Sequence, residues 1–239
     1  LCLIHLSKKG MPYQLQWRKL RFDREMLGQM VRYGLPSGVQ NSVIGLANVI
    51  LQSNINSFGK LAMAGYGAYS KLEGFAFLPI TSFTMALTTY TGQNLGAMQY
   101  DRAKKGARFG ILVSITLAEL IGVGMYVFAP QLISIFTPTP EVIALGTQQA
   151  RTIALFYCLL AYSHAVASVC RGAGKAFVPM TIMLVVWCVL RITYITIAMR
   201  ISHDIQLVYF AYPLTWSISS VIYFLYYVRK RGPVSYTHL

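Results

Sequence analysis

Acidic residues are scarce in this sequence of 239 residues: seven Asp and Glu stand against 21 Lys and Arg, which gives a formal net charge of +14. Charged residues of both signs make up only 12% of the chain, whereas 55% of it is hydrophobic. Disorder needs low hydrophobicity, so this composition excludes a disordered chain. Seven scattered acids also leave little material for a carboxylate metal cage or a catalytic carboxylate pair. The composition indicates a multi-span membrane protein.

Cysteine is also rare, and its four positions lie far apart: Cys2, Cys158, Cys170 and Cys188. No C-x-x-C spacing occurs, so the sequence suggests neither a zinc site nor a disulfide framework. We interpret these residues as small apolar packing residues. No metal site and no cofactor are predicted.

Catalytic motifs are missing as well. Ser37 lies between Pro36 and Gly38, outside any G-x-S-x-G frame, and no second group supports a serine nucleophile. His164, near the cytoplasmic end of the fourth predicted span, is interpreted as a hydrogen-bonded packing residue rather than a proton relay. An intramembrane enzyme is therefore disfavoured, and we predict that the chain is not an enzyme.

Six apolar stretches are long enough to cross a hydrocarbon core of about 30 Å, which takes about 20 helical residues. Their length favours helices over barrel strands, which show about ten alternating residues before a turn. The predicted fold is all-α and integral to the membrane, with six transmembrane helices at Leu35–Phe58, Ala62–Asn94, Lys105–Phe128, Glu141–Val169, Ala176–Met199 and Leu207–Tyr227.

The basic residues alternate between the two sides of the predicted spans. Only Lys60 and Arg200 fall in the three connections on one side. The other side holds sixteen: Lys8, Lys9, Arg18, Lys19, Arg21, Arg24, Arg32, Arg102, Lys104, Lys105, Arg108, Arg171, Lys175, Arg229, Lys230 and Arg231. The positive-inside rule places this basic side, with both ends of the chain, in the cytoplasm. The charge therefore reports topology, and nucleic acid is not a predicted partner.

Three segments are expected along the chain. Residues 1–31 would comprise the end of a preceding membrane helix (Leu1–Leu6) and a basic cytoplasmic linker, and residues 32–231 the six-helix transport lobe. Residues 232–239 are interpreted as a non-native sequencing or adapter remnant. The chain is therefore expected to be a fragment.

Ionisable side chains at membrane depth cost about 2.5–3.5 kcal/mol each on insertion scales, so each needs a reason. Glu73, Glu119, Arg151 and Arg191 fall at broadly similar depth in four predicted spans. A charge network is one hypothesis, with both acids facing both bases. This network could be a structural ion-pair cluster that holds the bundle together, or it could serve ion coupling or substrate binding.

The first predicted span carries a stripe of uncharged polar residues. Asn41, Asn48 and Gln52 lie on one helical face, together with Ser37, Gly45 and Asn56. Such a stripe suits the wall of a water-filled cavity, although amide hydrogen bonds between packed helices would also explain it. The tyrosines and tryptophans are interpreted as interfacial belts.

Several short segments follow one another in a fixed order: GLPSG at 34–38, AGYGAYSKLEGF at 64–75, TGQNLGA at 91–97, YDRA at 100–103 and CRGAGK at 170–175. Their order and spacing resemble the C-terminal half of the multidrug and toxic compound extrusion (MATE) transporters, over about residues 1–230.

The resemblance implies one lobe of a twelve-helix, two-lobe transporter of the inner or plasma membrane. It implies a secondary antiporter that exports drugs or other amphiphilic compounds in exchange for Na⁺ or H⁺ by alternating access. The expected partners are the lipid bilayer, small amphiphilic substrates and a missing N-terminal lobe. A flippase for lipid-linked precursors, from the same wider superfamily, is the alternative.

One departure from the family concerns the coupling acids. Some members carry acids in the first and fourth helices of this lobe, but here the first span has none and the fourth has only Glu141, at its end. Coupling is therefore expected to rest on Glu73, on Glu119 or on the missing lobe.

Overall fold

The computed structural model describes residue 21 and residues 23–229, except for the side chain of Tyr33. The predicted end of a preceding helix and the predicted remnant at 232–239 lie outside these residues. The chain divides into two compact units, residues 1–35 and 36–239. Within the described residues every regular element is a helix, which confirms the all-α prediction.

The first unit contains the start of helix α2 (Arg24–Asn56). Asp23 precedes this helix, and its Oδ1 accepts the backbone N–H groups of Glu25 at 2.9 Å and Met26 at 3.1 Å. An aspartate in this place satisfies donors that have no partner within the helix. A local side-chain cap therefore fixes where α2 begins.

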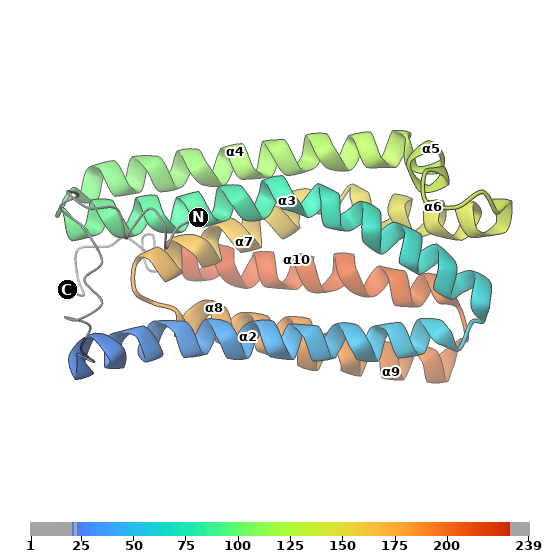
Figure 1. Ribbon diagram of the computed structural model, residues 1–239, viewed down its shortest axis with the longest axis horizontal. Helices are drawn as coiled ribbons and strands as arrows, with labels where there is room; N and C mark the ends of the chain where they lie inside the picture. Colours follow the sequence, from blue (N-terminus) through green and yellow to red (C-terminus); the bar gives the residue numbers. More distant parts are fainter. Residues whose placement is uncertain (1–20, 22, 230–239) are drawn as a thin grey trace. The chain divides into compact units, whose positions relative to one another are not determined.

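The second unit contains the rest of α2 and all later helices (Figure 1). Gly59 and Gly174 adopt φ angles of 95° and 75° in turns, a region that favours glycine because it has no Cβ. The elements that follow α2 are α3 (Lys60–Gly96), α4 (Tyr100–Val127), α5 (Ala129–Ser134), α6 (Pro140–Ala154), α7 (Tyr157–Gly172), α8 (Phe177–Met183), the π-helix η2 (Leu184–Leu190), α9 (Arg191–Ile201) and α10 (Ile205–Arg229).

Not every predicted span is apolar enough to be recognised as a membrane helix by composition. Within the described part of the chain, α4, the run Phe177–Ile201 and α10 are long and apolar enough to cross a membrane. The bent pair of α6 and α7 makes a fourth if it counts as one span. Helices α2 and α3 cover the first two predicted spans but fall short, because amides, hydroxyls and glycines interrupt their apolar residues.

The predicted span Glu141–Val169 is not one continuous helix in the structure. The helix breaks at Leu155 and Phe156, and α6 meets α7 at a bend of 56°. No proline or glycine lies near the break, so the local sequence gives no sign of it. A tertiary contact is made at the break, where Glu119 of α4 accepts the backbone N–H of Cys158 at 3.1 Å.

Small residues let the helices of the second unit approach closely. A Cβ on Gly92 of α3 would lie 3.4 Å from the carbonyl oxygen of Gly172, and one on Gly122 of α4 would collide with the carbonyl oxygen of Ala154. Close backbone approach of this kind is typical of membrane helix packing. In the bundle α3 packs against α4, α6 and α7.

Large aromatic side chains fill the core rather than only its edges. Trp216, Tyr69, Tyr157, Tyr209 and Tyr223 are fully buried. For these residues the prediction of interfacial belts is wrong, because their rings pack between helices. The sequence cannot separate the two cases, since both place aromatic residues within apolar runs.

Candidate functional site

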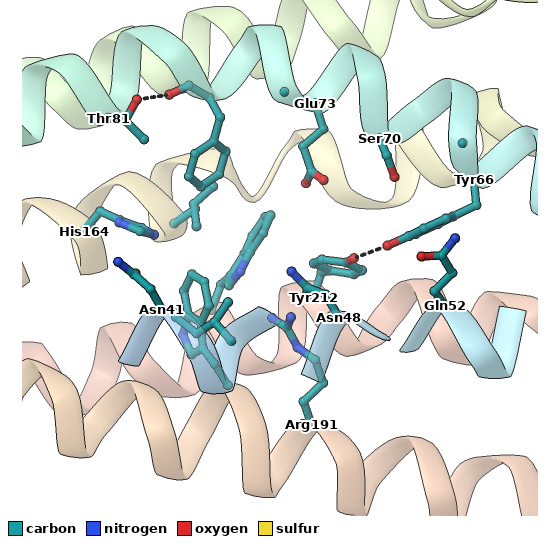
Figure 2. A pocket seen from close by; sticks show the side chains of 17 residues that line it. Asn41, Asn48, Gln52, Tyr66, Ser70, Glu73, Thr81, His164, Arg191 and Tyr212 are labelled. Atoms are coloured by element: carbon teal, nitrogen blue, oxygen red, sulfur yellow. Dashed lines mark hydrogen bonds between the residues drawn. The ribbon is translucent and has the colours of Figure 1, made fainter. Parts of the chain in front are cut away.

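A cavity of about 700 Å³ lies within the second unit (Figure 2). Its wall is formed by α2, α3, α7, η2, α9 and α10. The lining combines amides, aromatic rings, one carboxylate and one guanidinium: Asn41, Ile44, Asn48, Gln52, Tyr66, Gly67, Ser70, Glu73, Gly74, Phe77, Thr81, Leu160, His164, Trp187, Arg191, Tyr212 and Trp216. Most binding cavities for small organic molecules have this character, with mostly apolar walls and a few placed polar groups.

The α2 wall carries the predicted amide stripe. Asn41, Asn48 and Gln52 all line the cavity, as Figure 2 shows. Next to this stripe, Leu51 and Ile55 of the same helix are fully buried and belong to the hydrophobic core.

The α3 wall carries Glu73, whose carboxylate is held by a hydrogen bond within the helix. The hydroxyl of Tyr69, one turn earlier, donates to Glu73 Oε1 at 3.1 Å. The same hydroxyl lies 3.4 Å from the hydroxyl of Tyr157 on α7. Both tyrosines are fully buried, and the hydrogen bond from Tyr69 holds the Glu73 carboxylate at the cavity wall.

The wall opposite carries Arg191, which is only 2% exposed. Its Nη2 donates to Thr215 Oγ1 at 2.8 Å. The guanidinium carbon lies 4.6 Å from the ring centre of Tyr212 and 5.4 Å from that of Trp187. Cations over aromatic faces are stabilised by the ring quadrupole, so these rings hold the charge at the cavity surface.

The predicted four-charge network does not form. Glu73 and Arg191 share the cavity but are not in salt-bridge contact, and Figure 2 shows them on opposite walls. Glu119 instead binds the Cys158 amide at the start of α7. Arg151 is exposed, donates from Nε to the Tyr126 carbonyl at 3.4 Å and lies over the Tyr126 ring. Equal depth did not place these residues together, because depth says nothing about which way each helix faces.

Sequence reasoning missed several lining residues. The hydroxyls of Tyr66 and Tyr212 lie 3.5 Å apart, and Trp187 and Trp216 pack with their ring centres 6.4 Å apart. His164, interpreted as a packing residue, also lines the cavity, and its Nε2 is buried without a hydrogen-bond partner. Helical spacing was an available signal for some of them, because Phe77 and Thr81 lie one and two turns after Glu73. Trp187 likewise lies one turn before Arg191.

The cavity can hold an organic molecule but offers no evident metal centre. Among the described residues no group of three or more His, Cys, Asp or Glu side chains is arranged to bind a metal ion. A single carboxylate, a guanidinium and three amides can instead make hydrogen bonds to a polar group, while the aromatic rings cover an apolar surface.

Comparison with known proteins gives a consistent relationship. Residues 36–197 match the MatE family. The chain is 24% identical over 233 residues to the probable multidrug resistance protein YoeA of Bacillus subtilis (strain 168), covering 94% of this chain and 50% of that protein. It is also 25% identical over 148 residues to an FAD transporter of Shewanella oneidensis, covering 59% of this chain and 33% of that protein. The chain thus spans about half the length of the first of these relatives and about a third of the second.

Solved structures share the fold. An outward-facing multidrug resistance MATE family transporter of the MOP superfamily superimposes with a TM-score of 0.82 at 18% identity, covering 92% of this chain and 49% of that one. A MOP superfamily transporter from Pyrococcus furiosus, described as having a binding pocket of reverse polarity, gives a TM-score of 0.82 at 17% identity, covering 91% and 49%.

Proposed function

Since the chain belongs to the MatE family, we propose that it forms the second lobe of a two-lobe antiporter. This antiporter exports amphiphilic compounds in exchange for Na⁺ or H⁺. The relatives are integral membrane transporters, which confirms the predictions that the chain is a membrane protein and not an enzyme. The full transporter would comprise twelve helices around a cavity that opens to each side in turn.

One observation carries the proposal: a cavity with both polar and aromatic walls inside a bundle of membrane helices. A cavity whose polar groups include three amides and several hydroxyls can accept different solutes, because these groups donate and accept hydrogen bonds without fixing a charge. The aromatic rings supply apolar contact area at low entropic cost.

Within this scheme we assign ion coupling to Glu73 rather than Glu119. Glu73 faces the cavity, where an ion and a substrate could both reach it, whereas Glu119 binds a backbone amide at the break between α6 and α7. Ionisable residues that face a water-filled cavity commonly serve ion or proton pathways. The basic side of the bundle, with both chain ends, would face the cytoplasm of the inner or plasma membrane.

The test uses the full-length transporter in proteoliposomes loaded with the cationic dye rhodamine 123. Na⁺ and pH gradients are imposed separately, and dye movement is followed by fluorescence. We expect one gradient to drive the dye in the wild type, Glu73→Gln to abolish that movement, and Glu119→Gln to retain it. The matched pair removes one carboxylate charge at each site while keeping an amide oxygen as an acceptor.

Two results would contradict the proposal. Undiminished gradient-driven transport by Glu73→Gln would remove this residue from the coupling mechanism. Scrambling of a fluorescent lipid in the same vesicles, without dye transport under either gradient, would favour a lipid flippase instead.

A further inference from the structure

Arg191 is the least satisfied charge in the cavity. A guanidinium has five N–H donors. One N–H of Nη2 is bonded to Thr215, while Nε is buried without any partner. A buried donor without an acceptor loses the hydrogen bonds that water would give it, which is costly. Nη1 also has no partner among the described residues but is not fully buried, so it is the donor to which something in the cavity could supply an oxygen atom.

The described side chains around the guanidinium do not supply that oxygen. Glu73 lies on the opposite wall and accepts from Tyr69 rather than from Arg191. Tyr212 and Trp187 present ring faces, which stabilise a cation but accept no strong hydrogen bond. Thr215 already accepts from Nη2 and donates to the carbonyl of Ala211 at 2.8 Å, so it holds the guanidinium in one orientation.

The backbone before Arg191 is also unusual. The π-helix η2 ends at Leu190, directly before it. Such single-turn widenings of a helix occur frequently at functional sites. Here the segment carries Trp187, which lines the cavity beside Arg191. Both the fixed guanidinium and the aromatic plane next to it therefore face the same space.

We propose that Arg191 binds an oxyanion, a carboxylate or phosphate, of a soluble aromatic compound carried by the cavity. The planar fork of arginine matches the two oxygens of such groups, and the pairing would supply an acceptor for Nη1. The ring of the compound would pack against Trp187 and Trp216. This inference rests on the proposed transport function for its biological meaning, but binding alone tests it.

The test measures binding of two dyes to the purified full-length transporter by fluorescence anisotropy. Rhodamine 110 carries a free carboxylate, and rhodamine 123 is its methyl ester. We expect Arg191→Gln to weaken rhodamine 110 binding at least about tenfold, the loss typical of one charge-assisted hydrogen bond. Rhodamine 123 binding should stay within about twofold. Arg151→Gln, which removes an exposed arginine outside the cavity, should change neither affinity.

Thr215→Val provides a second variant in case Arg191→Gln does not fold. It keeps the guanidinium but removes the acceptor that orients it, so rhodamine 110 binding should weaken several-fold without a change for rhodamine 123. Phenyl phosphate should displace rhodamine 110 from the wild type.

The inference is overturned if Arg191→Gln and Thr215→Val weaken both dyes equally, or if neither variant weakens rhodamine 110. Displacement of rhodamine 110 by phosphatidic acid but not by phenyl phosphate would also overturn it, in favour of a lipid headgroup. Because binding needs no ion gradient, dye discrimination could persist even where gradient-driven transport fails, which separates this inference from the proposed function.

Discussion

Two pairs of oppositely charged residues lie in different environments: Glu73 with Arg191, and Glu119 with Arg151. In the sequence all four are charged residues at similar predicted depth in the membrane. The first pair faces a cavity from opposite walls. The second pair lies near the break between α6 and α7, where each residue binds a backbone group of a neighbouring helix. The first pair is left with unused hydrogen-bonding capacity, while Glu119 satisfies a donor that the broken helix exposes.

This difference separates two demands on a membrane bundle. Residues at the break satisfy backbone groups, so their loss should reduce stability without altering ligand preference. Residues in the cavity keep groups available for a ligand, which costs stability in its absence. Substitutions that measure stability and dye binding together can therefore confirm or break the comparison.

The largest effect is expected at Gly122, one turn after Glu119. The Ala154 carbonyl occupies the space that a Cβ would need, and a backbone group cannot swing aside as a side chain can. Gly122→Ala should therefore destabilise the protein by about 1–3 kcal/mol, the usual cost of overpacking. Thermal unfolding of the purified protein in detergent would show this as a lowered Tm.

Gly124→Ala is the matched control on the same helix, because nothing lies within 4 Å of its added Cβ. Its Tm should stay close to wild type. Equal losses at the two positions would show that the break is not tightly packed against α4. Rhodamine 123 affinity should be unchanged in both variants.

A somewhat smaller loss is expected for Glu119→Ala. The substitution leaves the N–H of Cys158 without its acceptor and removes a negative charge from the start of α7, where the helix dipole favours one. We expect a loss of about 1–2 kcal/mol. Glu119→Gln keeps an oxygen acceptor and should lose less. If alanine and glutamine variants both unfold at the wild-type temperature, Glu119 does not stabilise the break.

The sequence predicted the cavity wall better than the break. The stripe of Asn41, Asn48 and Gln52 follows from helical periodicity alone. Glu73 and Arg191 were singled out because a charged side chain in a membrane is energetically costly. These signals are local, and the structure puts all five residues at one cavity. Their roles in transport stay a prediction.

Glu119 and Arg151 were singled out for the same energetic reason, but their hydrogen-bond partners could not be predicted from the sequence. The Cys158 N–H has no acceptor within its own helix only because the helix breaks there, so it is available to Glu119. No proline or glycine near the break indicates its position in the sequence. Trp187, Tyr212 and Trp216 were missed for a related reason. An aromatic residue in an apolar run suits the core, the membrane interface or a cavity wall, and only tertiary packing decides among them.

The smallest effect on stability is expected for Arg191→Met, and it tests the comparison from the cavity side. Methionine has a similar reach and can contact the Trp187 and Tyr212 rings through its sulfur. Thr215 loses a donor, but its own hydroxyl keeps the Ala211 carbonyl as acceptor, so no buried donor is orphaned. Removing a buried charge that lacks a charged partner offsets the lost cation–π contacts.

The free energy of unfolding of Arg191→Met should stay within about 1 kcal/mol of wild type or rise, while discrimination between rhodamine 110 and rhodamine 123 is lost. A fall in Tm as large as that of Gly122→Ala would show that Arg191 holds the bundle together, and the contrast between the two regions would then fail.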